Sequence, residues 1–346
     1  MSGAPAPQGA ASAGAALEGR RLLVTGGAGF IGRHVVRALR ACGARVRVID
    51  LLSGSDPTVD LIQGDLVEPE VRAAALEGGC DGVVHLAAVT SVLRSLEQPE
   101  LTFRTNVRAT HGLLEDARRA GASALVFAST NAVCGLAETL PITEATQLRP
   151  LTPYGATKAA GEMLMWAYTS SYGLRCSHLR LTNVYGPGMQ AKDSIVARLM
   201  RCVRLGSTFE IYGDGAQVRD YVHAHDVVDA VLLALADERW HGPVVIGSGR
   251  SLSVLEVIEQ VRAVTGAELA VRHGPPKAGE MPAVVVDNSH ARALGWRPRY
   301  DFATGVTGVW EEWRSLDLEL AKPLAGGAGL ADAQGGKAGV RSTDGW

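Results

Sequence analysis

Hydrophobic residues recur along the first half of the chain in short strand-like runs that alternate with longer helical patterns. The pattern predicts strands near 21–25, 45–50, 59–62, 82–86, 123–128 and 175–181, and helices near 30–42, 69–77, 97–120 and 154–172. This alternation is typical of an α/β protein with a Rossmann-type, doubly wound parallel sheet that has helices on both faces. Ligands of such sheets bind at the carboxyl ends of the strands, where we expect the site residues.

The second half of the chain is less regular. After Asn183, glycine and proline interrupt the pattern at 185–188, 212–215 and 274–276. We expect a Rossmann domain over 21–182 and a smaller mixed α/β lobe over 183–320, with some later segments returning to the first domain. The Ala/Gly/Ser/Pro-rich residues 1–20 predict a disordered leader, and the Gly/Ala-rich residues 321–346 predict a flexible tail.

Composition excludes several classes of protein. The 346 residues carry a net charge of −2 and show no Lys/Arg cluster, so we expect no nucleic-acid or membrane surface. No apolar run of about 18 residues predicts a transmembrane helix. Five scattered cysteines without metal-ligand spacing favour free thiols in a reducing cytoplasm. His223 and His225 form an HxH pair without further ligands nearby in the sequence, so we expect no metal site.

A glycine motif lies between the first strand and the first helix. Gly26, Gly29 and Gly32 have the spacing that brings dinucleotide phosphates close to the backbone at a helix N-terminus. Asp50 ends the next strand, where a carboxylate can accept the adenosine ribose hydroxyls and repel a 2′-phosphate. NAD is therefore favoured over NADP. Arg33 could hold a phosphate, but its place inside the helix indicates a solvated side chain.

A tyrosine and a lysine define the candidate chemistry. Tyr154 and Lys158 are four residues apart in a predicted helix, so both side chains lie on one face. A nearby ammonium group stabilises a phenolate and lowers the pKa of the phenol from its usual value of about 10. The spacing therefore predicts that Tyr154 acts as a general base.

These and further motifs resemble those of extended short-chain dehydrogenases/reductases of the nucleotide-sugar epimerase/dehydratase family, most of all the UDP-glucose 4-epimerase group. The resemblance extends from about residue 21 to residue 310. The stretches that carry it are TGGAGFIG (25–32), GDL (64–66), HLAA (85–88), TNVRATHGLLEDAR (105–118), FASTNAVCG (127–135), PYGATK (153–158), RLTNVYGPG (180–188) and YGDGAQVRDYVHAHDV (212–227).

The resemblance implies roles for individual residues. The catalytic residues are Thr130, Tyr154 and Lys158. Asp65 would contact the adenine, and the helix that contains Asn106 would brace the active site. The implied NAD-binding residues are Gly26, Gly29, Phe30, Ile31, Gly32, Asp50, Leu51, Asp65, Leu66, Leu86, Ala87, Ala88, Asn106, Tyr154 and Lys158.

The implied substrate-binding residues are Thr130, Asn183, Tyr212, Arg219 and Lys277. Arg219 would hold the diphosphate through its planar guanidinium group, which can donate two parallel hydrogen bonds to phosphate oxygens. The alternative is a salt bridge between Arg219 and Asp220 or Asp226. Tyr212 would flank the base or pack within a loop. Lys277 replaces a second family arginine, and Cys134 replaces a family tyrosine, which favours an enlarged or altered sugar pocket.

The implied reaction is NAD-dependent epimerisation of a UDP- or dTDP-linked sugar, with C4 as the expected centre, through a 4-keto intermediate. The alternatives are a 4-ketoreductase, a decarboxylase, a 4,6-dehydratase, a 2-epimerase and a non-catalytic NAD-binding scaffold. Residues 131–132 carry no carboxylate, which argues against the dehydratase and the decarboxylase. The resemblance also implies a homodimer that is built on a four-helix bundle. The candidate residues for its apolar seam are Leu113, Leu114, Met163, Met165 and Trp166. The alternative is that these residues belong to the internal core.

Overall fold

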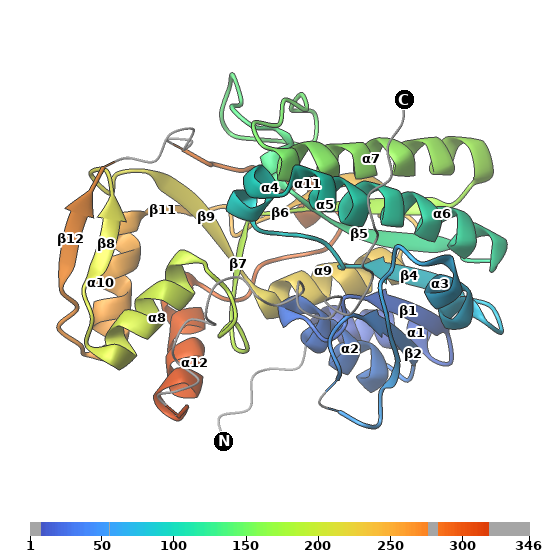
Figure 1. The fold of residues 1–346 in the computed structure, drawn as a ribbon, viewed down its shortest axis with the longest axis horizontal. Coiled ribbons are helices and arrows are strands. Elements are labelled where there is room, and N and C mark those ends of the chain that lie inside the picture. Colours follow the sequence, from blue (N-terminus) through green and yellow to red (C-terminus); the bar gives the residue numbers. More distant parts are fainter. Residues whose placement is uncertain (1–7, 55, 276–282, 318–346) are drawn as a thin grey trace, which may run out of the picture.

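Seven parallel strands form the central sheet, in the order β10-β6-β5-β4-β1-β2-β3 (Figure 1). The structure is a computed structural model that describes residues 8–54, 56–275 and 283–317. The sheet confirms the predicted Rossmann-type fold, and each predicted strand is present. The strands are β1 (Arg21–Thr25), β2 (Arg45–Asp50), β3 (Asp60–Gln63), β4 (Gly82–His85), β5 (Ala124–Thr130), β6 (Arg175–Leu181) and β10 (Gly242–Ile246).

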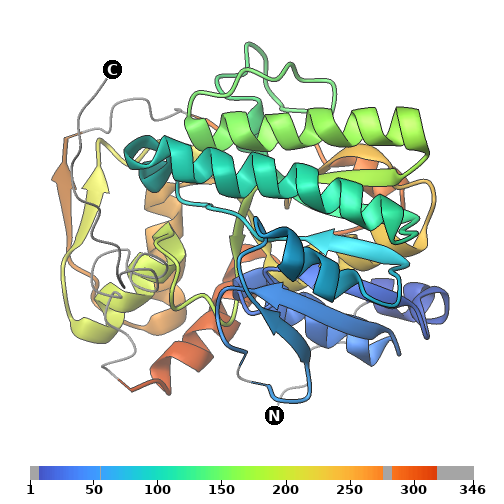
Figure 2. The same cartoon turned by 45° about the vertical axis from the view of Figure 1, so that its right-hand side comes forward.

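Helices cover both faces of this sheet (Figures 1 and 2). Alternate residues of a strand point to opposite faces, so Val24 packs toward one helical layer while Leu23 packs toward the other. The first layer contains α1 (Gln8–Leu17), α2 (Phe30–Ala41), α9 (Ala224–Ala236) and α11 (Ser289–Ala293). The second contains α3 (Pro69–Leu76), α6 (Ala109–Arg119) and α7 (Pro153–Tyr172).

Helix α1 differs from the expected disordered leader. Residues 8–17 are helical, and Ala13 and Leu17 are buried in the same core cluster as residues of α2 and α9. The prediction is wrong for this segment because alanine favours helices and because the partners of these apolar side chains lie far away in the sequence. Residues 1–7 and the expected tail at 321–346 lie outside the described residues.

The helix expected at 97–120 is divided into several elements. These are α4 (Val92–Glu97), α5 (Pro99–Phe103), a π-helical turn (Arg104–Arg108) and α6. Pro99 separates α4 from α5, because a proline is tolerated in the first turn of a helix but interrupts its interior. The π-helical turn contains Asn106, which is buried.

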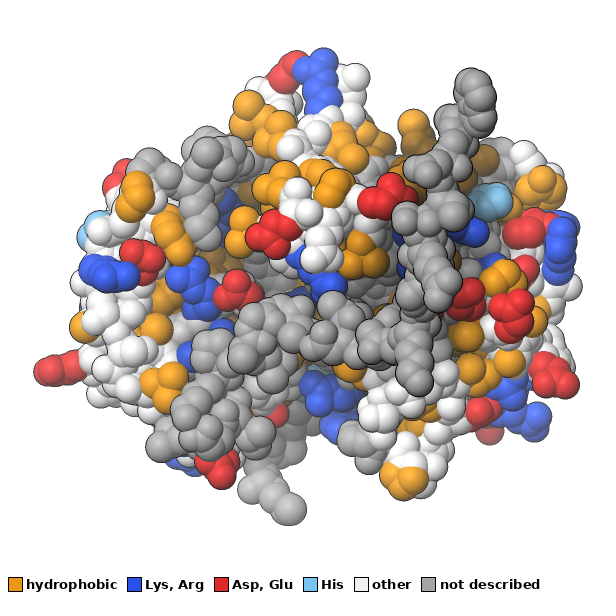
Figure 3. Space-filling view, viewed as in Figure 1, with side chains coloured by type: hydrophobic (Ala, Val, Ile, Leu, Met, Phe, Trp, Pro, Cys, Tyr) orange, Lys and Arg blue, Asp and Glu red, His pale blue; other side chains and the backbone are white. Residues whose placement is uncertain are grey.

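Helix α7 has clear signals at both ends. The side chain of Thr152 accepts a hydrogen bond from the backbone N–H of Gly155, Pro153 occupies the first turn, and Gly173 ends the helix in the left-handed conformation at φ 72°. Its surface is mixed: Met163 and Trp166 are exposed, whereas Met165 is buried beneath them, as are Leu113 and Leu114 of α6. Figure 3 shows hydrophobic side chains gathered on the upper part of the molecule, where Figure 1 places α7 and the segment before it.

The later part of the chain forms a smaller lobe with its own core, although α9, β10 and α11 return to the central sheet. One sheet contains β7 (Asn183–Tyr185), β9 (Val218–His223) and β11 (Ser251–Ser253), and a second pairs β8 (Phe209–Tyr212) with β12 (Val271–Gly274). Its helices are α8 (Ile195–Leu205), α10 (Val254–Thr265) and α12 (Phe302–Arg314). Within the described residues, no helix combines the length and apolar character of a membrane span.

Candidate active site

The glycine motif forms a tight turn between β1 and α2. A Cβ atom on Gly26, whose φ is 74°, would lie 2.7 Å from the backbone nitrogen of Ala87. A Cβ atom on Gly32 would lie 2.1 Å from the carbonyl oxygen of Gly26. Neither position accommodates a side chain, so backbone alone faces the space at the N-terminus of α2. Such a cradle suits a dinucleotide pyrophosphate.

The first residues of α2 support this cradle from behind. Phe30 packs against the core of the smaller lobe, and Ile31 packs against a core cluster of the Rossmann domain. Both side chains are only partly buried, so their predicted contact with the cofactor stays a prediction. Gly29 precedes α2 as its N-cap residue.

Asp50 lies beside the glycine turn, at the end of β2. Its carboxylate accepts hydrogen bonds from the backbone N–H groups of Ala28, at 2.9 Å, and Leu52, at 3.0 Å. These bonds hold the carboxylate where the sequence places the adenosine ribose. Arg33, by contrast, donates to the carbonyl oxygen of Gly188 at 2.8 Å. Arg33 is exposed, as expected, and it also contacts the smaller lobe through this bond.

The predicted adenine end of the site contains an unexpected ion pair. Asp65 accepts from the backbone N–H of Val67, and Arg104 donates to its other carboxylate oxygen at 3.0 Å. Leu66 is buried, while Leu51 is 38% exposed, so these two residues offer different surfaces to a ligand. Leu86, Ala87 and Ala88 follow β4, next to the glycine turn.

Asn106 joins two parts of the active-site frame. Its Oδ1 accepts from the N–H of Val89 at 2.8 Å, and its Nδ2 donates to the carbonyl of Val89 and to Oγ1 of Thr157, both at 3.0 Å. Both amide hydrogens thus have protein partners. In this structure Asn106 braces the segment after β4 against α7, as the resemblance implied for its helix, and its amide nitrogen has no hydrogen left for a ligand.

Lys158 is buried beneath the carboxyl end of β5. Its ammonium nitrogen donates to the carbonyl of Ala128 at 2.8 Å and lies 4.5 Å from the centre of the Phe127 ring. Only 2% of the residue is exposed. Burial disfavours the charged form and lowers the pKa of Lys158 to about 7.

Tyr154 and Thr130 are the other two predicted catalytic residues. Burial raises the pKa of Tyr154 to about 12, and a hydrogen bond with the Thr130 side chain acts in the opposite direction. The expected lowering of this pKa by Lys158 is therefore wrong for the protein without its cofactor, because lost hydration of the phenolate dominates. The predicted contact between Thr130 and Tyr154 is present.

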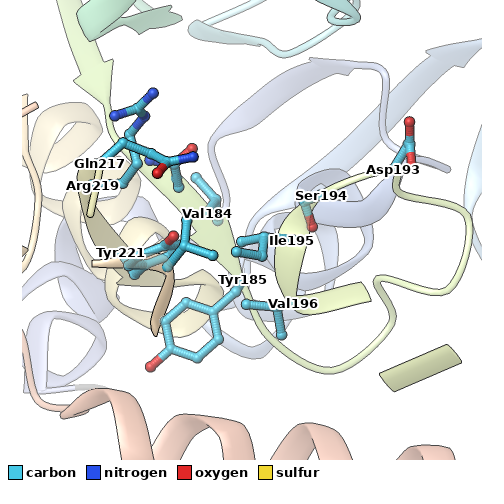
Figure 4. Close-up of a pocket in the computed structure, with 11 residues that line it drawn as sticks. Val184, Tyr185, Asp193, Ser194, Ile195, Val196, Gln217, Arg219 and Tyr221 are labelled. Atoms are coloured by element: carbon cyan, nitrogen blue, oxygen red, sulfur yellow. The ribbon is translucent and has the colours of Figure 1, made fainter. Parts of the chain in front are cut away.

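Two adjoining hollows mark the smaller-lobe side of the site. The first has a volume of about 260 Å³ and brings Asn183 and Arg219 together. Arg219 of strand β9 and Gln217, just before the strand, lie on one side, and the start of α8 lies on the other (Figure 4). Its lining residues are Asn183, Val184, Tyr185, Asp193, Ser194, Ile195, Val196, Gln217, Arg219, Tyr221 and Val254. Tyr154 and Lys158 are not among them.

The second hollow, of about 120 Å³, contains Tyr212 and shares Ile195, Gln217 and Val254 with the first. The guanidinium carbon of Arg198 lies 5.5 Å from the centre of the Tyr212 ring. The structure thus brings three of the predicted substrate residues, Asn183, Tyr212 and Arg219, to the joint lining of the two hollows, which we call the substrate wall. The fourth, Thr130, lies on the catalytic side, and Lys277 lies outside the described residues.

The carboxylates proposed as alternative partners of Arg219 have other roles. Asp220 accepts from Thr182, Ser248 and Gly249, and Asp226 accepts from the backbone of Arg299 and Tyr300. The Arg219 side chain itself donates to the carbonyl of Val218 at 2.8 Å.

Sequence reasoning missed several lining residues. Gln217 lies two positions before Arg219, and this period indicates the same side of a strand. Ser194 precedes the apolar pattern of α8, which is a helix-start signal. No such signal marks Asp193. The buried hydroxyl of Ser194 has no hydrogen-bond partner among the described residues.

Two further predictions can be compared with the structure. Cys134 is completely buried in a cluster with Ile142 and Val284, and the expected effect of this residue on the sugar pocket stays a prediction. His223 accepts from the backbone N–H of His225 at the start of α9. Across the described part of the chain, no three His, Cys, Asp or Glu side chains are placed to hold a metal ion.

The fold and the site define the class of protein: a Rossmann-type enzyme with a glycine cradle, a Tyr–Lys pair and a polar wall on a second lobe. The model of the NAD-dependent epimerase/dehydratase family matches residues 22–247. The chain belongs to this family and is an NAD-dependent enzyme.

Individual relatives agree with this assignment. The UDP-glucose 4-epimerase of Mycolicibacterium smegmatis is 33% identical over 309 residues, which cover 85% of this chain and 99% of the relative. The Thermus thermophilus UDP-glucose 4-epimerase in complex with NAD is 35% identical, with a TM-score of 0.80 and coverage of 86% and 100%. The dTDP-glucose 4,6-dehydratase of Streptomyces venezuelae with bound NAD is also 35% identical, with a TM-score of 0.78 and coverage of 85% and 97%.

Proposed function

We propose that the protein inverts the configuration at C4 of a nucleotide diphosphate sugar, with a UDP-linked hexose as the first candidate substrate. The observation that carries this proposal is the constellation at the end of β5. There the Thr130 side chain lies near enough to the Tyr154 phenol to lower its pKa, the buried Lys158 follows one helical turn later, and residues 131–132 supply no carboxylate. The names of the epimerase relatives support the same reaction.

In this proposal, the Rossmann domain binds the cofactor and the smaller lobe binds the substrate. The glycine turn and Asp50 would hold the NAD pyrophosphate and ribose, and Arg219 with Asn183 would hold the substrate. When bound, NAD supplies reversible hydride transfer at the sugar carbon, through a 4-keto sugar, and the positive charge of its nicotinamide ring.

Proton transfer is carried out by the chain itself. Tyr154 would take the proton of the sugar 4-hydroxyl, with Thr130 as the hydrogen-bonded relay. A phenol whose pKa is about 12 needs nearby positive charge to act near neutral pH. Lys158 supplies such a charge in its ammonium form from one helical turn away.

The dehydratase and the decarboxylase require a carboxylate that the catalytic loop does not provide. Overall similarity does not select among the reactions, because the dehydratase and the epimerase resemble this chain equally. Glu162 does not take over the role, since it is buried and paired with Arg180 at 2.8 Å. The ketoreductase and the 2-epimerase remain the second candidates, and the product distinguishes them.

The test is proton NMR on the purified protein without added NAD. UDP-glucose, UDP-glucuronate, UDP-N-acetylglucosamine and dTDP-glucose are incubated separately. We expect a new anomeric signal at unchanged mass for one of them. A keto sugar, a loss of water or CO2, or turnover that depends on added reduced cofactor would contradict the proposal. Tyr154→Phe should abolish turnover and retain NAD, while Tyr172→Phe, an exposed tyrosine at the other end of α7, should remain active.

We also propose that two copies associate through α7 and the adjoining helices. Met163 is 63% exposed and Trp166 is 44% exposed, which is unusual for such large apolar side chains on one helix. Light scattering should show a dimer that Met163→Lys converts to a monomer. Leu255→Lys, at a 44% exposed position on α10, should leave the dimer intact.

A further inference from the structure

The cofactor helix α2 is hydrogen-bonded directly to the smaller lobe. Arg33 donates to the carbonyl oxygen of Gly188, and Nε2 of His34 donates to the carbonyl oxygen of Pro187, both at 2.8 Å. The acceptor is a carbonyl, so Nε2 of His34 carries the proton. Burial lowers the pKa of His34, which keeps the ring neutral near pH 7. Both donors lie at the junction of the first and second turns of α2, directly after the glycine cradle.

The same segment is also held by α12 and by Asp301, the residue that precedes this helix. Glu312 accepts from the backbone N–H of Gly188 at 2.7 Å, and the hydroxyl of Tyr185 donates to the carbonyl of Asp301 at 3.2 Å. Gly188 adopts φ 86°, and a Cβ atom there would lie 3.1 Å from Nη2 of Arg33. We call Arg33, His34 and Glu312, with the Pro187–Gly188 backbone between them, the lobe clamp.

The lobe clamp lies between the two segments that form most of the first hollow. Residues 183–185 line this hollow before the clamp, and residues 193–196 line it after the clamp. Pro187 and Gly188 belong to the connection between these two lining segments. Hydrogen bonds that hold Pro187 and Gly188 in place therefore also restrict the positions of both lining segments. Phe30, also on α2, packs against the core of the smaller lobe and reinforces the attachment.

We propose that Arg33 and His34 are positioning residues that set the affinity of the substrate wall by tying it to the cofactor helix. This inference rests on the proposed function for the identity of the ligand. It assigns neither residue to the chemistry, because neither is part of the catalytic constellation. Helix α2 thereby acquires a second role, because its N-terminus faces the cofactor while the junction of its first and second turns places the substrate wall.

The test compares four variants as NAD-containing proteins. His34→Leu removes one donor and Arg33→Met the other, while His34→Gln retains an N–H donor. Arg37→Met removes an exposed charge one turn further along α2 and is the matched control. We measure the Kd of UDP by calorimetry, KM and kcat for the substrate identified by NMR, and the NAD content.

A single hydrogen bond of this kind corresponds to roughly a threefold to tenfold change in affinity. We expect His34→Leu and Arg33→Met to raise the Kd of UDP and the KM by this factor, with kcat within twofold and NAD content unchanged. His34→Gln and Arg37→Met should remain near wild type. An unchanged Kd in both loss variants, or a Kd that rises only where NAD is lost, would overturn the proposal.

Hydrogen exchange provides a reading that needs no ligand. In His34→Leu, the amides of residues 183–196 should exchange faster than in wild type, while those of α2 keep their protection. Equal exchange in this segment overturns the lobe clamp, whatever the substrate. If wild type neither binds UDP nor turns over any nucleotide sugar, the proposed function fails, and the exchange result still decides the clamp separately.

Discussion

Glu162→Gln tests how the catalytic strand and helix are held together. Glu162 of α7 and Arg180 of β6 are 1% and 3% exposed. Arg180 donates to both carboxylate oxygens of Glu162, to Oε2 at 2.8 Å and to Oε1 at 3.1 Å. The hydroxyl of Ser129 donates to Oε1 of Glu162 at 2.5 Å. Ser129 immediately precedes Thr130, so the network reaches the catalytic hydroxyl through the backbone.

The expected cost follows from burial of the charge. Glutamine has the size of glutamate but no charge, so Arg180 would remain buried without its counter-ion. Removing one partner of a buried ion pair typically costs about 3–5 kcal/mol. Domains are stable by only about 5–15 kcal/mol, so we expect a large part of the free energy of unfolding to disappear.

The assay is urea unfolding of the NAD-containing protein, monitored by circular dichroism. Glu259→Gln breaks an exposed ion pair with Arg262, 2.7 Å apart, and should cost no more than about 0.5 kcal/mol. The double variant Glu162→Leu/Arg180→Met removes both charges and should be more stable than Glu162→Gln. A loss below about 1 kcal/mol in Glu162→Gln would refute the reasoning.

Three further predictions concern other parts of the molecule. Gly32→Ala should release NAD, because its Cβ would lie 2.1 Å from a carbonyl oxygen. The control Gly308→Ala, which has open space around it, should retain NAD. The NAD content of each variant after gel filtration tests this prediction. Deleting residues 1–18 removes the fully buried Leu17 and should cost about 2 kcal/mol or more, so an unchanged melting temperature would contradict the docking of α1. Between pH 7 and pH 10.5, Lys158 is largely deprotonated in the folded protein, where its pKa is about 7, but protonated in the unfolded chain, where its pKa is 10.5. The free energy of unfolding should therefore rise with pH across this window. Urea titrations of Lys158→Met should lack this contribution.

The sequence predicts the central sheet well because the signals there are local. The runs at β1, β2 and β6 have the predicted bounds, and the glycine turn and α2 follow β1 as expected. Helix α1 could not be predicted from its composition, because its burial depends on a surface formed by α2 and α9. The break at Pro99 carried a local signal, but the π-helical turn after it carried none.

The site shows the same division between local and tertiary information. Motif spacing predicted the glycine turn and the Tyr154–Lys158 pair, and the resemblance added Thr130. The structure places the glycine turn after β1 and Thr130 at the end of β5, with β4 between these strands. The partners of Asp65 and Gly188 were not predictable, since Arg104 lies 39 residues from the first and Arg33 lies 155 residues from the second. The pKa of Tyr154 depends on its burial, which the spacing of two residues does not reveal.

The energetics of the site explain why such distant contacts matter for catalysis. Burial opposes the charged forms of both Lys158 and Tyr154, so the groups that the chemistry needs do not stabilise the fold by themselves. The surrounding frame consists of polar groups with matched partners, such as Asn106 and the Glu162–Arg180 pair. A frame of this kind keeps the catalytic side chains in place when their own hydration would favour exposure. Substitutions in the frame should therefore impair turnover even where they touch no ligand, and more than exposed substitutions of equal size.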